Sequence, residues 1–95
     1  MTMIKVVCDL QKRTVDISGH AGFDEYGKDI VCAAVSGIAQ YFARITMKYG
    51  GSALKNDGYL RIEYPGELDI IAEEFARVLE EIAEDYPGHL RVEVK

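Results

Sequence analysis

The chain has 95 residues, of which 48% are hydrophobic and 28% charged, and a formal net charge of −5. This length and composition suit one compact domain, so we expect residues 1–95 to fold around a single core. The negative charge disfavours direct contact with nucleic acid, because phosphate binding requires clustered lysine and arginine side chains. The first residues carry no signal-peptide pattern, and the longest apolar run, residues 30–39, is too short to span a bilayer. We therefore expect a cytoplasmic protein with no membrane partner.

A β-hairpin is predicted near the start of the chain. Residues 3–10 alternate between apolar and polar side chains, with Ile4, Val6 and Cys8 on the inward face. A polar turn leads to a second strand at residues 14–18, and the two runs suit an antiparallel pair. Residues 19–28 contain three glycines and no hydrophobic period, which indicates a loop.

A long helix is predicted at residues 29–49. Asp29 is a good N-cap, which would place Cys32 at the N3 position, and glycines at 50 and 51 suit a left-handed helix end. Apolar side chains cover most of its sides, which predicts a central, buried helix. Its remaining face carries only small side chains, namely Cys32, Ser36, Ala39 and Ala43. This small-residue face indicates the close approach of another backbone, a partner subunit or a substrate strand.

The second half of the chain contains a second hairpin, a second helix and a last strand. Strands at residues 52–55 and 59–64 flank an Asn-Asp-Gly turn. An amphipathic helix follows and ends near residue 85, and residues 90–94 alternate as a short strand. The order ββαββαβ predicts the α+β class, with two helices packed on a mainly antiparallel sheet.

Two cysteines and two histidines are the candidates for reactive chemistry. Neither pair has a chelating spacing, so we expect no metal and no cofactor. Cys32 stands out because unpaired amides at a helix start favour a thiolate, although a small buried side chain is the alternative. Cys8, in the middle of a predicted strand, is expected to belong to the core. His20, flanked by Gly19 and Gly22, is either the partner of Cys32 or a solvated loop residue.

Two further polar residues could support a site at Cys32. Asp29 can orient His20 as a third member, although we favour its role as a helix cap. Ser36 lies one helical turn after Cys32. Its hydroxyl can bond the thiol or a substrate backbone, or the small side chain can simply leave space.

The loop between Gly22 and Gly27 is a candidate substrate-binding segment. Its aromatic residues, Phe23 and Tyr26, offer surface for a substrate side chain, and the two glycines permit a hinged lid. A flexible surface loop explains the same residues equally well.

The eighteen residues from Gly19 to Ser36 resemble the signature of the bacterial ribosomal-processing cysteine protease family (Prp). The string reads Gly-His-Ala-Gly, four variable residues, Gly, one variable residue, and then Asp-Ile-Val-Cys-Ala-Ala-Val-Ser. The resemblance implies a catalytic dyad in which His20 is the base and Cys32 the nucleophile, with Asp29 in support. It also implies a homodimer with a mobile loop between the histidine and the cysteine. The implied substrate is a large-subunit ribosomal protein, which loses a short N-terminal extension by a cut after phenylalanine.

Our interpretation of the sequence is a cysteine endopeptidase that acts on a ribosomal protein. The alternative is a non-enzymatic, ribosome-associated module that binds a peptide with the same loop, while Cys32 merely packs. A thiol redox protein ranks third, because Cys8 and Cys32 are not in a Cys-x-x-Cys arrangement. Preferential reactivity of Cys32 over Cys8 would favour the enzyme.

Overall fold

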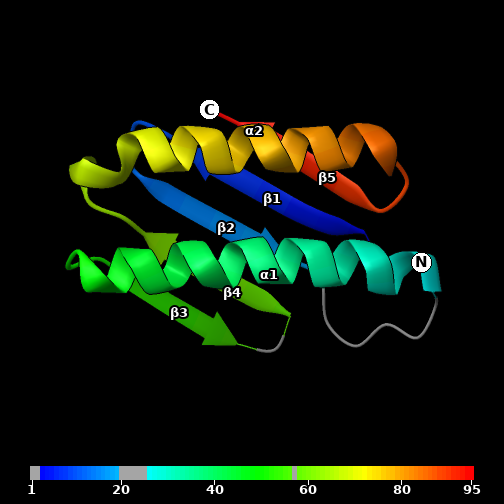
Figure 1. Ribbon diagram of the computed structural model, residues 1–95, viewed down its shortest axis with the longest axis horizontal. Helices are drawn as coiled ribbons and strands as arrows, with labels where there is room; N and C mark the ends of the chain where they lie inside the picture. Colours follow the sequence, from blue (N-terminus) through cyan, green and yellow to red (C-terminus); the bar gives the residue numbers. More distant parts are fainter. Residues whose placement is uncertain (1–2, 20–25, 57) are drawn as a thin grey trace.

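The structure, a computed structural model, describes residues 3–19, 26–56 and 58–95. The chain forms β1 (Ile4–Asp9), β2 (Thr14–Ser18), α1 (Tyr26–Lys48), β3 (Ser52–Asn56), β4 (Tyr59–Glu63), a 3-10 turn (Gly66–Leu68), α2 (Asp69–Asp85) and β5 (Leu90–Val94). The two helices lie side by side on one face of the sheet and form a second layer (Figure 1). The predicted order ββαββαβ and the α+β class are confirmed.

The sheet has the strand order β3-β4-β2-β1-β5. Both predicted hairpins are present, because β1 pairs antiparallel with β2 and β3 pairs antiparallel with β4. The strands β2 and β4 are also antiparallel, whereas β5 runs parallel to β1. The sheet is therefore mainly antiparallel, as predicted, and β3 and β5 form its two edges.

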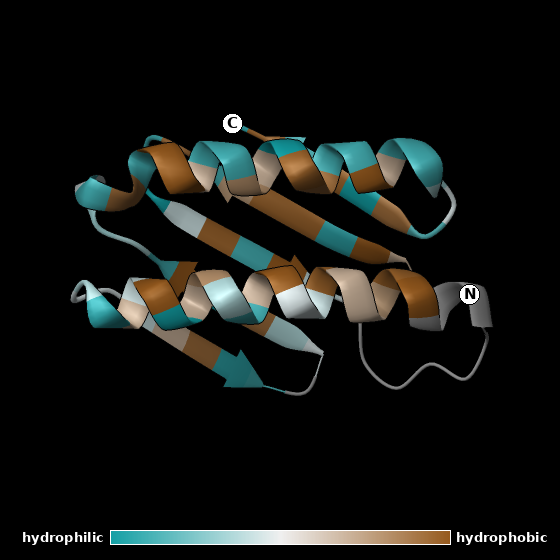
Figure 2. Cartoon of the chain, viewed as in Figure 1, coloured by the Kyte–Doolittle hydropathy of each residue, from teal (hydrophilic) through white to brown (hydrophobic). Residues whose placement is uncertain are grey.

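The core lies between the sheet and the helix layer and follows the alternation of the strands. The strands contribute the buried side chains Ile4, Val6, Cys8, Val15, Ile17, Leu60, Ile62 and Leu90. Phe42 of α1 stacks on Phe75 of α2 with 4.8 Å between ring centroids, and its ring lies 5.4 Å from that of Tyr64. Figure 2 shows hydrophilic residues interleaved with hydrophobic ones along both helices, as expected for helices with one side in the core.

Helix α1 is not buried on all sides, contrary to the prediction. Val31, Val35 and Phe42 are each 1% exposed, whereas Ile30 is 58% and Tyr41 65% exposed. A helix in an outer layer buries only the side that faces the sheet and its neighbouring helix, so the rest of its surface stays open. Residues 30–48 are long and apolar enough to cross a membrane by length and composition alone, and the expectation of no membrane partner stays a prediction. The core helix of a soluble protein passes the same test.

The end of α1 follows the prediction made from its two glycines. Gly50 has a φ of +90°, in the left-handed region, and the amide of Gly51 donates to the carbonyl of Thr46 at 2.9 Å. These bonds turn the chain directly into β3. As a result, the edge strand β3 runs beside α1 in the lower part of Figure 1.

Candidate active site on helix α1

Cys32 lies well inside α1, almost two turns after the first helical residue, Tyr26. The predictions that Asp29 caps the helix and that Cys32 occupies N3 are therefore wrong. An N-cap preference is a local effect of about 1 kcal/mol, and here the helix includes residues 26–28, which were predicted to belong to the loop. The unpaired amides of a helix start occur only in its first turn, so they are not at Cys32.

The side chain of Cys32 contacts that of Ser36, one turn further along α1. The two side-chain atoms, Cys32 Sγ and Ser36 Oγ, lie 4.0 Å apart, at the long limit for a hydrogen bond to sulfur, and either can donate. Both residues are half-buried. The thiol and the hydroxyl therefore lie together at the boundary between the core and the surface.

Cys8 has a different environment. Its side chain is 1% exposed and belongs to the core, as predicted. Burial, and to a lesser degree the nearby carboxylate of Glu80, raise the pKa of Cys8 to about 12. This thiol is therefore neutral at physiological pH and closed to substrates, which leaves Cys32 as the candidate nucleophile.

Several predicted site residues lie in or beside the undescribed part of the chain. His20, Gly22 and Phe23 lie outside the described residues, and so do the side chains of Tyr26 and Asp29. The backbone at residues 26 and 27 is the first turn of α1, which shortens the predicted loop at its C-terminal end. Within residues 3–19, 26–56 and 58–95, no three His, Cys, Asp or Glu side chains gather to hold a metal ion.

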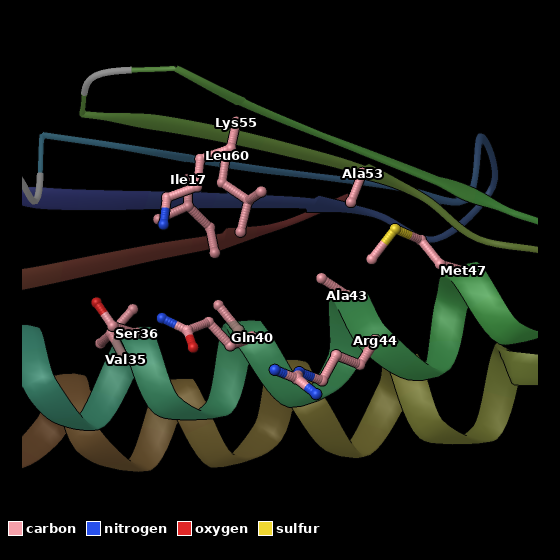
Figure 3. A pocket seen from close by; sticks show the side chains of 11 residues that line it. Ile17, Val35, Ser36, Gln40, Ala43, Arg44, Met47, Ala53, Lys55 and Leu60 are labelled. Carbon is pink, nitrogen blue, oxygen red and sulfur yellow. The ribbon is translucent and has the colours of Figure 1, made fainter.

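A groove of about 250 Å³ runs beside Ser36, between α1 and the strands β2, β3 and β4 (Figure 3). Helix α1 lines it with Val35, Ser36, Ala39, Gln40, Ala43, Arg44 and Met47, and the strands with Ile17, Ala53, Lys55 and Leu60. Three residues of the predicted small-residue face, Ser36, Ala39 and Ala43, therefore line this groove. The sequence indicated that another chain segment or molecule comes close to this face. It did not predict which residues form the opposite wall of the groove, because these come from three separate strands.

Comparison with known proteins assigns the chain to a family. Residues 1–91 match the family described as cysteine protease Prp. The chain belongs to this family. The ribosomal processing cysteine protease Prp of Bacillus subtilis is 31% identical over 90 residues, which cover 81% of this chain and 80% of the relative. The Mycoplasma genitalium protein of the same name is 33% identical over 93 residues, or 93% of this chain and 92% of the relative.

Solved structures with similar folds include that of the S. aureus ribosomal processing protease Prp, determined in complex with a substrate peptide. It has a TM-score of 0.79 and 22% identity, with full coverage of both chains. A Streptococcus mutans protein has a TM-score of 0.76 and 23% identity, covering 99% of this chain and 93% of its own. Membership of the Prp family confirms the resemblance noted in residues 19–36 and makes this chain a cysteine protease, a class of hydrolase.

Proposed function

We propose that this Prp-family chain is an endopeptidase that removes a short N-terminal extension from a large-subunit ribosomal protein. The observation that carries the proposal is the contrast between the two cysteines. Cys32 is half-buried, touches Ser36 and lies next to a groove, whereas Cys8 is enclosed in the core. The relatives from B. subtilis and M. genitalium are named for ribosomal processing, which supports the substrate class.

In the proposed mechanism, His20 is the base and Cys32 the nucleophile. His20 accepts the thiol proton, and the sulfur attacks the scissile carbonyl carbon to form a carbon–sulfur bond. The amide bond then breaks, and His20 returns the proton to the leaving amine. Water hydrolyses the thioester, which releases the new carboxylate and restores the thiol. The unpaired amides at the start of α1 do not serve as donors to the oxyanion in this mechanism, because α1 begins almost two turns before Cys32.

We further propose that the enzyme works as a homodimer in the cytoplasm, where its thiols stay reduced. Two large apolar side chains on the outer side of α1, Ile30 and Tyr41, are 58% and 65% exposed, which is compatible with cover by a partner subunit. Sedimentation equilibrium of the wild-type protein and of Tyr41→Glu tests this. A dimer that weakens on substitution supports the proposal, whereas a wild-type monomer at micromolar concentration contradicts it.

The decisive experiment incubates the protein with a peptide spanning the N-terminal extension of the host's large-subunit ribosomal protein. Mass spectrometry should detect a single cut after phenylalanine with the wild-type protein and none with Cys32→Ala. The matched control is Cys8→Ala, which removes the other thiol and should retain the cut.

Three other outcomes of that experiment bear on the assignment. A cut that persists in Cys32→Ala would refute the role of this thiol. Tight binding without a cut in any variant would instead favour a peptide-binding module. A cut of unchanged rate in His20→Ala would refute the role of the histidine as base.

A further inference from the structure

We propose that the groove beside Ser36 binds the substrate as an extended peptide and selects an apolar side chain three to five residues from the scissile bond. This inference rests on the proposed peptidase function and adds the site that recognises the substrate. The groove lies next to the thiol, because Ser36 both contacts the sulfur of Cys32 and lines the groove. A peptide bonded at Cys32 would therefore enter the groove at its Ser36 end.

The spacing along α1 sets the position of the selected side chain. Cys32, Ala39 and Ala43 lie on the same side of the helix, and each helical residue advances about 1.5 Å. Ala39 and Ala43 are thus about 10 and 16 Å from Cys32 along the helix axis. An extended peptide advances about 3.3 Å per residue, so these distances correspond to about three and five residues.

The walls of the groove suit an apolar side chain. Ala39 and Ala43 present only methyl groups from the helix. Ile17, Leu60 and Ala53 line the groove from the sheet, and Ala53 lies across from Ala43 (Figure 3). Met47, at the far end, is 52% exposed and has an unbranched side chain that adapts to its contacts. A volume of about 250 Å³ is smaller than the pocket of a typical drug-sized ligand, so the groove holds one or two side chains rather than a cofactor.

The charges at the groove exclude basic side chains. Arg44 and Lys55 border the groove with positive charges. Gln40 contributes a neutral side-chain amide, and the described lining contains no carboxylate. A lysine or arginine of the peptide placed here would meet like charge without a partner, which disfavours its binding. The groove therefore prefers apolar over basic residues, although the whole chain carries a net charge of −5.

The neighbouring edge strand favours an extended conformation of the peptide. β3 supplies Ala53 and Lys55 to the groove and pairs only with β4 in the described sheet. The other side of an edge strand carries backbone groups without strand partners, and an added peptide strand can bond to them. Main-chain bonds to β3 would supply affinity, while the groove would supply selectivity for the side chain.

The test uses the peptide that spans the N-terminal extension of the ribosomal protein. It also uses versions of this peptide in which each residue in turn is replaced by alanine or by lysine. Ala43→Leu adds three carbon atoms to the groove and should raise KM by about tenfold or more, as expected for one displaced apolar side chain. The same KM increase should follow lysine replacement of a peptide residue three to five positions from the cut. The increases in KM caused by Ala43→Leu and by the lysine replacement should be non-additive, because both changes remove the same contact between the peptide and the groove.

Two further substitutions keep this test interpretable. Gly37→Leu is the matched control, because it also places a leucine side chain on α1, at a position with no atom within 4 Å of an added Cβ and outside the groove. It should leave KM unchanged.

Arg44→Glu, at the border of the groove, should make the lysine-substituted peptide a better substrate than it is for the wild-type protein. Iodoacetamide labelling of Cys32 should be the same in every variant, which excludes damage to the thiol site.

The outcomes separate the groove from the catalytic proposal. The groove assignment would be overturned, and the peptidase function left intact, if Ala43→Leu cleaved the unsubstituted peptide with an unchanged KM and Arg44→Glu cleaved the lysine-substituted peptide no better than the wild-type protein does. If no protein cleaves, fluorescence anisotropy measures peptide binding to Cys32→Ala with and without Ala43→Leu. Binding weakened by Ala43→Leu would support the groove and refute the peptidase, and binding that is absent or unaffected would overturn the groove.

Discussion

The two thiols should differ by orders of magnitude in their reactivity toward iodoacetamide. The pKa of Cys8 is raised to about 12 by burial, so at pH 8 about one Cys8 thiol in 10⁴ is ionised. In the unfolded chain, with an ordinary pKa near 8.5, about one in four is ionised. Because the thiolate is the reacting species, folded Cys8 should react at least about 10³-fold more slowly than unfolded Cys8. Cys32, which is half-buried, should react first.

The assay follows iodoacetamide incorporation at pH 8 by mass spectrometry of proteolytic fragments, with and without guanidinium. Cys32→Ala isolates the signal of Cys8, and Cys8→Ala isolates that of Cys32. Any labelling of Cys8 in the native protein should track opening of the core, and should therefore rise with denaturant. Equal labelling of both cysteines in the folded protein would refute the argument from burial and would remove the contrast on which the proposed function rests.

Three further predictions concern stability and are checked by urea denaturation. The free energy of unfolding should fall between about pH 8.5 and 12, because burial raises the pKa of Cys8 and Tyr64, each to about 12, and the unfolded chain therefore loses these protons first. Tyr64→Phe should flatten this pH dependence, and an unchanged slope would contradict the assignment. Gly51→Ala should destabilise by about 1–3 kcal/mol, because its Cβ would collide with the Glu63 carbonyl oxygen. Gly37→Ala, in open space on α1, should instead stabilise by about 0.5–1 kcal/mol, and equal effects at both glycines would contradict the steric argument.

The start of α1 shows where local signals fall short. Asp29 has the side chain of a good cap, but the helix begins at Tyr26. Cap preference is a weak local effect, and it gave the wrong boundary where the preceding residues also join the helix. The other end was predicted correctly, because Gly50 adopts a left-handed φ that other residues rarely adopt.

The sequence by itself determined the elements, their order and the inward faces of the strands. Alternation with a period of two identified the buried side of β1 and β2, and the paired turns identified both hairpins. The motif at residues 19–36 indicated the family and singled out Cys32. The alternation and the turns depend on contacts between near neighbours in the chain, so the residues alone carry them.

Only the tertiary structure decided how distant segments meet. The parallel pairing of β5 with β1 makes β5 one edge of the sheet and leaves β3 as the opposite edge, and no local pattern specifies that order. The groove depends on the same arrangement, because its walls combine the small-residue face of α1 with Ile17 and Leu60 from two different strands. Periodicity can place a side chain on a face of its own element, but the partner of that face is set by packing across the whole chain.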